Sequence, residues 1–260
     1  MRVGCYQFDP RPYDIPHNTD IICGVIDTCE LDLIIFPELA LTGYLFDSKE
    51  QLRAYALSSE SSYIKRIQHM VDSHDTAAVL GYAERDSLTQ KIYNSAICLR
   101  PDLEPIIYRK AHLFDTERLV FDTGDTGFFC FDLKGVKLGM LVCFDHYFPE
   151  AARSLMLQGT QIICHPSNLV LEGAAQLTTR VRSMENRVFW LLCNRCGSQQ
   201  GLNFTGGSQI TNPNGSIATS AQRDTSSLIT ADIDPKKALD KSISERNDII
   251  KDRRSDLYTL

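Results

Sequence analysis

Val136-Lys-Leu-Gly-Met-Leu-Val-Cys143-Phe-Asp-His-Tyr-Phe-Pro-Glu150 joins an apolar strand to the start of a helix, with a cysteine at the junction. The apolar run before Cys143 is typical of a buried strand, and Pro149 with Glu150 is typical of a first helical turn. A thiol placed there faces the positive end of a helix dipole, which can lower its pKa below the reference of about 8.5. A lone cysteine in an apolar strand is more often an inert core residue. Other parts of the chain must decide between these interpretations.

Strand and helix patterns alternate along the chain. The predicted strands are short apolar runs rich in Val, Ile, Phe and Tyr: Val3–Phe8, Leu33–Phe36, Ala77–Tyr82, Ile92–Leu99, Ile106–Tyr108, Phe128–Phe131, Lys137–Val142, Gln161–His165, Val188–Cys193, Gly207–Thr211 and Leu228–Ile233. The predicted helices have apolar residues at helical spacing: Thr19–Glu30, Lys49–Leu57, Ser61–Ser73, Pro149–Gln158 and Ala174–Arg187. So many strands predict at least one large sheet.

Two stretches, Gly81–Arg100 and Phe128–Val142, have the pattern of antiparallel hairpins, the second with the turn Asp132-Leu-Lys-Gly135. Because strands and helices also alternate, we predict an α/β fold with a mixed sheet, or two packed sheets flanked by helices. One domain over residues 1–260 is favoured. The charged segment from about 235 to 260 is expected to pack on a neighbouring subunit or on the surface, with disorder as the alternative.

The composition of the chain disfavours several classes of partner and site. The net charge is −6, and Lys and Arg are scattered, which disfavours nucleic acid and anionic membranes as partners. The N-terminus reads as a strand without the apolar region of a signal peptide, and no apolar run approaches membrane-spanning length, so a cytoplasmic location is expected. Nine cysteines, most in apolar runs, indicate reduced thiols. The spacing Cys193-Asn-Arg-Cys196 lacks a second pair, which disfavours a metal site.

Two charged residues end apolar runs elsewhere in the chain. Glu38 follows Leu33-Ile-Ile-Phe-Pro37, and burial there would raise its pKa toward neutrality, as suits a proton acceptor. Lys110 ends Pro105-Ile-Ile-Tyr-Arg-Lys110. Each signal is weak alone, but Glu38, Lys110 and Cys143 together provide a base, a cation and a nucleophile for attack on a carbonyl or nitrile carbon.

Three segments carrying these residues resemble the signature segments of the nitrilase superfamily of carbon–nitrogen hydrolases, in the same order. They are Pro37-Glu-Leu-Ala-Leu-Thr-Gly-Tyr44, Tyr108-Arg-Lys-Ala-His-Leu-Phe114 and Val142-Cys-Phe-Asp-His-Tyr-Phe-Pro-Glu150. Further matching segments extend to Arg253-Arg-Ser-Asp-Leu-Tyr258, so the resemblance covers essentially the whole chain.

The resemblance implies a four-layer α-β-β-α sandwich with two mixed β-sheets, usually assembled into a homodimer or a higher homo-oligomer. It implies a triad of Glu38 as general base, Lys110 as the cation that stabilises the transition state, and Cys143 as nucleophile. It implies no metal and no organic cofactor.

Four more residues are candidates for positioning substrate or binding the oxyanion. Glu117 matches a second glutamate of the family, with an exposed surface acid as the equal alternative. The backbone N–H of Phe144 is the expected oxyanion donor. Tyr44 is expected to line the pocket on grounds of family position, and His146 to shape it.

The expected function is hydrolysis of a small amide or N-carbamoyl compound through a Cys143 thioester, with release of ammonia. A nitrile-hydrolysing enzyme ranks lower because true nitrilases more often have Cys-Trp-Glu at the nucleophile. A non-catalytic interaction scaffold is the alternative from a different class. The predicted specificity loops, around Thr116–Asp125 and Asn168–Ala175, offer no decisive pair of arginines or acids to fix the substrate's charge.

Overall fold

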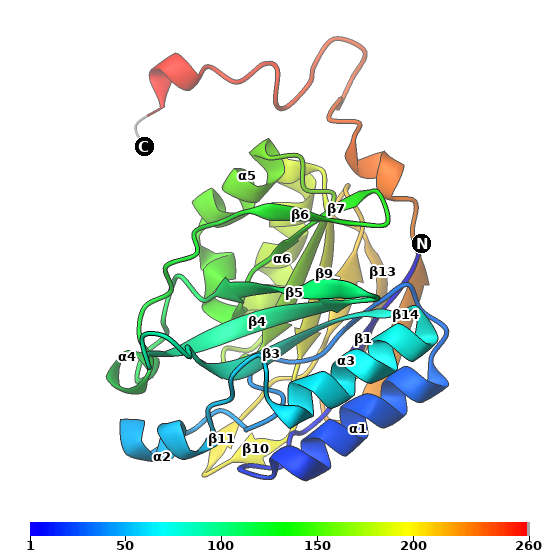
Figure 1. Cartoon of the computed structure of the whole chain (residues 1–260). Helices are drawn as coiled ribbons and strands as arrows, with labels where there is room; N and C mark the ends of the chain where they lie inside the picture. The colour runs from blue at the N-terminus through cyan, green and yellow to red at the C-terminus, as the bar shows by residue number, and fades with distance from the viewer. Residues whose placement is uncertain (259–260) are drawn as a thin grey trace.

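Two six-stranded sheets pack face to face, with helices on their outer faces (Figure 1). The computed structural model describes residues 1–258. Within that range, none of the helices combines the length and apolarity needed to cross a bilayer.

The first sheet has the strand order β14-β1-β2-β3-β4-β5. Its strands are β1 (Arg2–Gln7), β2 (Leu33–Ile35), β3 (Ala77–Arg85), β4 (Ile92–Arg100), β5 (Leu103–Arg109) and β14 (Ser227–Asp232). Strands β1, β2 and β3 are parallel, whereas β3, β4 and β5 are antiparallel. The sheet is therefore mixed, and the predicted hairpin of residues 81–100 is confirmed.

The second sheet has the order β13-β12-β9-β8-β7-β6 and is also mixed. Its strands are β6 (Cys130–Leu133), β7 (Val136–Met140), β8 (Ile162–Ser167), β9 (Phe189–Asn194), β12 (Gln209–Thr211) and β13 (Ile217–Ser220). The turn between β6 and β7 places Lys134 and Gly135 at φ of 51° and 80°. Two positive φ values match the twist of a tight hairpin, which confirms the predicted turn. A separate ribbon pairs β10 (Ser198–Gln199) with β11 (Leu202–Asn203).

Six α-helices and three short 3₁₀ helices are described within residues 1–258. They are α1 (Ile15–Thr28), α2 (Lys49–Tyr55), α3 (Ser62–His74), α4 (Glu117–Val120), α5 (Pro149–Leu157), α6 (Ala174–Asn186), η1 (Cys143–Tyr147), η2 (Pro235–Ala238) and η3 (Ser255–Leu257). Helix α1 begins four residues before the predicted Thr19, because Asp14 accepts a hydrogen bond from the His17 amide and Pro16 fits the first turn.

The core is arranged in layers. One cluster fills the space between the sheets and extends to α5 and α6, and includes Val3, Ile35, Met140, Ile163 and Leu155. A second cluster lies between the first sheet and helices α1 and α3. The order helix, sheet, sheet, helix confirms the predicted four-layer α-β-β-α sandwich (Figure 1).

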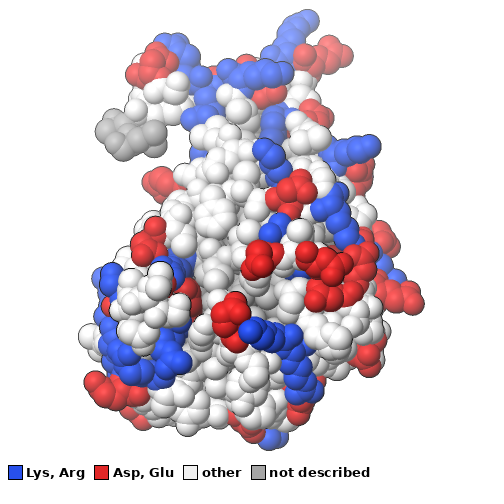
Figure 2. All heavy atoms as spheres, viewed as in Figure 1, with Lys and Arg blue, Asp and Glu red and all other residues white. Residues whose placement is uncertain are grey.

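The C-terminal segment leaves this body after η2 and arches above the end of the body at which α5 lies (Figure 1). The Lys241 ammonium donates to the carbonyls of Asn186 and Arg187, each at 2.9 Å, whereas Leu257 remains 68% exposed. Acidic and basic side chains are mixed on this segment and over the viewed face (Figure 2). That the segment packs on a neighbouring subunit stays a prediction, and residues 259–260 of it lie outside the described range.

Candidate active site

Three strand ends from two sheets converge at one place. Glu38 follows β2 and Lys110 follows β5 in the first sheet, whereas Cys143 follows β7 in the second. The Lys110 ammonium lies 2.7 Å from Glu38 Oε1, and both side chains are completely buried. The Cys143 thiol is close enough for the charges of both to act on its pKa. The sequence-predicted set is therefore brought together.

Glu38 is held by groups from three other elements. Its Oε1 accepts hydrogen bonds from Lys110 Nζ and Asn94 Nδ2, each at 2.7 Å, and its carbonyl accepts one from Asn168 at 2.9 Å. A Cβ at Gly81 would lie 2.4 Å from the Glu38 Cα, so only glycine allows this close approach. Glu38 Oε2 has no hydrogen-bond partner among residues 1–258, which leaves it free to accept a proton.

Burial raises the pKa of Glu38 above its ordinary 4.5, and the nearby Glu117 carboxylate raises it further, although Lys110 opposes both effects. The shift has the direction expected from the sequence. A base with a raised pKa is better matched to proton transfer near neutral pH than an ordinary carboxylate.

Glu117 is buried in the same cluster, not exposed on the surface. Its two carboxylate oxygens lie 2.8 Å from Lys110 Nζ, and they also accept hydrogen bonds from the Tyr44 hydroxyl at 2.8 Å and the Phe114 amide at 3.1 Å. These contacts satisfy both oxygens. Glu117 thus orients the lysine, while Glu38 keeps one oxygen available.

The Lys110 side chain is a permanent ammonium in this setting. Burial lowers its pKa, but the two carboxylates of Glu117 and Glu38 outweigh burial and raise the pKa above its ordinary value of 10.5. A positive charge is therefore fixed beside the thiol at all pH values near neutral.

The protonation state expected for Cys143 from the helix dipole is wrong. Burial raises the pKa of the Cys143 thiol well above 9.0, and the adjacent Glu38 carboxylate raises it further. The helix that begins at Cys143 is a five-residue 3₁₀ helix, too short for a strong dipole to offset desolvation. Near neutral pH the Cys143 side chain is therefore a thiol, and its sulfur can attack only with the help of a base.

Cys143 lies on a strained turn that presents its sulfur. Its φ of 43° is unusual for a residue with a side chain, and such strain recurs at functional sites. Asp145 holds the turn by accepting from the Val142 amide at 2.9 Å and the Tyr108 hydroxyl at 2.8 Å. These contacts fix the direction of the sulfur.

A second contact to the same turn comes from β8 and β9. The indole N–H of Trp190 donates to Nδ1 of His165 at 3.1 Å, which leaves Nε2–H to donate to the Cys143 carbonyl at 2.9 Å. Burial lowers the pKa of His165 to about 3, so its ring stays neutral. His165 therefore has a structural role.

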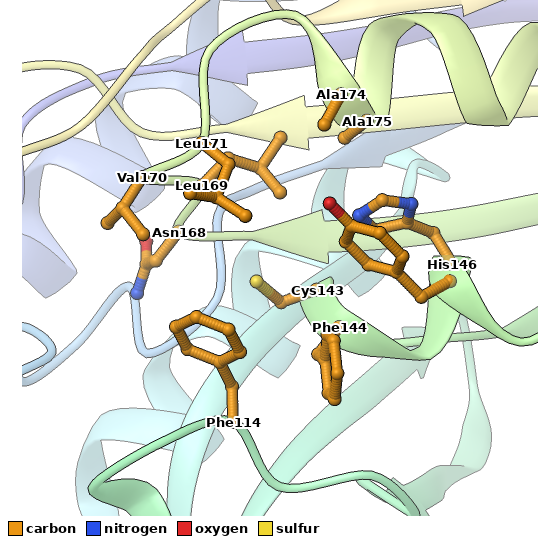
Figure 3. A pocket seen from close by; sticks show the side chains of 11 residues that line it. Phe114, Cys143, Phe144, His146, Asn168, Leu169, Val170, Leu171, Ala174 and Ala175 are labelled. Atoms are coloured by element: carbon orange, nitrogen blue, oxygen red, sulfur yellow. The ribbon is translucent and has the colours of Figure 1, made fainter.

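The sulfur of Cys143 points into a pocket (Figure 3). His146 lines it, as predicted, and its Nδ1 lies 2.6 Å from the Thr178 hydroxyl. Phe144 lines it as well, and the role of its backbone N–H as oxyanion donor stays a prediction. Tyr44 is not part of the lining described within residues 1–258, because its hydroxyl is bonded to Glu117 instead. Tyr44 nevertheless lies close enough to Cys143 for the charge of that group to raise the pKa of its hydroxyl, so its expected place beside the substrate stays a prediction.

Sequence reasoning missed Asn94 and Asn168, the two amides that hold Glu38. Asn94 is near the start of β4, and Asn168 lies directly after β8, where a predicted specificity loop begins. Neither position carries a local signal for a contact with Glu38. All nine cysteines are free, including the Cys193 and Cys196 pair. In the described part of the chain, no group of three His, Cys, Asp or Glu side chains is arranged to hold a metal ion.

Comparison with known proteins agrees with this geometry. The family model described as carbon-nitrogen hydrolase matches residues 2–239. A nitrilase of Pyrococcus abyssi is 37% identical over 87% of this chain and 86% of its own length, and an (R)-stereoselective amidase of a Pseudomonas species is 32% identical over 98% and 92%. An amidase structure from Nesterenkonia sp. superposes with a TM-score of 0.82 at 24% identity, covering 99% of this chain and 94% of that one, and so shows the same fold. The chain belongs to the carbon–nitrogen hydrolase family.

Proposed function

We propose that this protein hydrolyses the C–N bond of a small linear amide or N-carbamoyl compound through a thioester on Cys143, releasing ammonia. The observation that carries the proposal is the free Oε2 of Glu38, in a buried cluster with Lys110 beside the Cys143 thiol. A thiol with a raised pKa needs a base at hand, and Glu38 is the carboxylate with an oxygen to spare.

The proposed steps follow from these positions. As the sulfur attacks the carbonyl carbon, its proton passes to Glu38, and the oxyanion is stabilised by the Lys110 charge and the Phe144 backbone N–H. Glu38 then protonates the leaving nitrogen as the C–N bond breaks, which leaves an acyl thioester. Water gives a proton to Glu38, attacks the thioester and releases the acid, and the proton returns to the sulfur.

The test measures product and intermediate together. We expect ammonia release from a panel of small amides and N-carbamoyl compounds. Acid-quenched protein should carry the acyl mass on the peptide that contains Cys143, since a thioester survives acid. Ammonia release without any acyl adduct, under conditions where deacylation is slow, contradicts the thioester route. No turnover and no labelling of Cys143 by an alkylating agent supports the scaffold alternative.

We also propose that the chain acts as one domain that forms a homodimer or a higher homo-oligomer. Leu177, Val181 and Met184 are exposed by 62%, 36% and 52%, and they lie on one side of α6 at helical spacing. An apolar stripe of this kind is typical of a surface covered by another subunit. The apolar residues near the end of the C-terminal segment support its packing on that neighbour. The nine free thiols support a reducing, cytoplasmic location.

The Leu177→Glu variant is expected to dissociate this assembly, because it places a charge at the most exposed residue of the apolar stripe. The molar mass in solution, measured by sedimentation, should fall to that of the monomer. Leu88→Glu is the matched control, since Leu88 is 92% exposed in the hairpin between β3 and β4. A wild-type protein that sediments as a monomer contradicts the proposal.

A further inference from the structure

Any part of the substrate beyond its reacting carbon must lie in the pocket over Cys143. Glu38 and Lys110 are buried and bonded to each other at 2.7 Å, and neither belongs to the lining of this pocket. When ammonia is the leaving group, the whole remainder of the molecule belongs to the acyl side. The lining of this pocket therefore selects the acyl group.

The lining is mostly apolar, with Asn168, His146 and Tyr147 as its polar but uncharged members. Phe114 and Phe144 form one side, and the segment Leu169–Leu171 with Ala174 and Ala175 of α6 forms the other (Figure 3). Among the side chains described for the lining, none is a lysine, arginine, aspartate or glutamate. A charged acyl group would therefore lose its hydration without gaining an ionic partner.

The charged groups nearest to this lining are already paired. Arg182 acts on His146 from α6, but its guanidinium lies 3.1 Å from Glu185 and also donates to the Tyr147 carbonyl. Burial lowers the pKa of His146 to about 4, so its ring is neutral at physiological pH. Neither group offers a free charge to a carboxylate or an ammonium.

We infer that the substrates are amides with an uncharged, apolar acyl group, which packs against Phe144, Leu169 and the first turn of α6. This inference rests on the proposed function and adds the class of substrate. It disfavours amides with a terminal ammonium or a terminal carboxylate. Ala174 and Ala175 place small apolar side chains on the α6 side of this pocket.

The experiment compares three amides of similar length on the wild-type protein: hexanamide, 5-aminopentanamide and 4-carbamoylbutanoate. The second replaces the terminal methyl of the first by an ammonium, and the third ends in a carboxylate. We expect kcat/KM for each charged amide to be roughly 100-fold or more below that for hexanamide, since an unpaired charge is costly in an apolar site.

A pair of variants tests the position of the acyl chain. Leu171 is half exposed at the pocket and so tolerates substitution. Leu171→Glu should raise kcat/KM for 5-aminopentanamide relative to hexanamide by roughly tenfold, because it supplies the missing opposite charge. Leu171→Gln is the matched neutral control and should leave that ratio nearly unchanged.

The outcomes separate this inference from the proposed function. Equal kcat/KM for all three amides, or a preference for a charged one, overturns the apolar-acyl inference and leaves hydrolysis through Cys143 standing. An equal change of the ratio in both Leu171 variants also overturns it. Ammonia from none of the three amides, with no acyl adduct on Cys143 from the wider panel, overturns the proposed function and this inference with it.

Discussion

Glu38→Gln is expected to lower kcat/KM for amide hydrolysis roughly 1000-fold while the fold is retained, since general acid–base catalysis typically contributes 10²–10⁴-fold. Glutamine keeps an oxygen for the contacts of Oε1 with Lys110 and Asn94, but it cannot accept the proton of Cys143. Because the pKa of that thiol is raised, the variant has no thiolate to attack with near neutral pH. Initial rates of ammonia release measure the loss.

Glu117→Gln is the matched control for Glu38→Gln. Both carboxylates lie within 2.8 Å of Lys110 Nζ, but the oxygens of Glu117 are all occupied. Its replacement weakens a charge-assisted hydrogen bond and should cost on the order of tenfold in kcat/KM. A larger loss of kcat/KM from Glu117→Gln than from Glu38→Gln would show that Glu117, and not Glu38, is the base.

The raised pKa of Glu38 also gives a pH dependence with a definite sign. Catalysis needs the ionised carboxylate, so kcat/KM of the wild-type protein should rise with pH through a midpoint above 4.5. For stability the sign is opposite: a raised folded-state pKa contributes stability that is present below pH 4.5 and is lost as pH rises through the folded-state value. The free energy of unfolding of Glu38→Gln minus that of the wild-type protein should therefore increase from pH 4 to pH 8, as measured by urea titration.

Much of this site could be predicted from the sequence because its three central residues end apolar strands. Glu38, Lys110 and Cys143 each follow a run that must be buried, and a chain that delivers three reactive groups to strand ends has few other uses for them. The family resemblance then supplied their order. The alternating patterns predicted a mixed sheet or two packed sheets flanked by helices, and the resemblance supplied the four-layer order. Short elements were missed, such as α4, the β10–β11 ribbon and the mostly exposed β13.

The electrostatics could not be predicted in the same way, because they depend on contacts between distant segments. A helix dipole at Cys143 is predicted from its immediate neighbours alone, whereas burial and Glu38 decide its protonation. Likewise, nothing near Glu117 in sequence indicates its contact with Tyr44, which is 73 residues away. Local sequence patterns predict which strand or helix carries a side chain, whereas the packing of the sheets determines which residues surround that side chain.

Lys110→Met is expected to lower both turnover and stability, because Lys110 balances two buried carboxylates. Without the ammonium, Glu38 and Glu117 face each other with no cation among their described contacts. Removing one partner of a buried ion pair typically costs 3–5 kcal/mol, so we expect a loss of about 4 kcal/mol in the free energy of unfolding at pH 8. The loss should shrink at pH 5, where the carboxyls can take up protons.

The double variant Lys110→Met with Glu117→Gln separates the two effects, because it removes one negative charge together with the positive one. It should regain most of the lost stability but none of the lost turnover, which we expect to be roughly 1000-fold below wild type since the oxyanion has lost its charged partner. In both variants Cys143 should still react with iodoacetamide, as shown by the mass of its peptide, because Glu38 remains to take the proton. If the double variant is folded and has the kcat of the wild-type protein, Lys110 serves only to balance charge and has no part in stabilising the transition state.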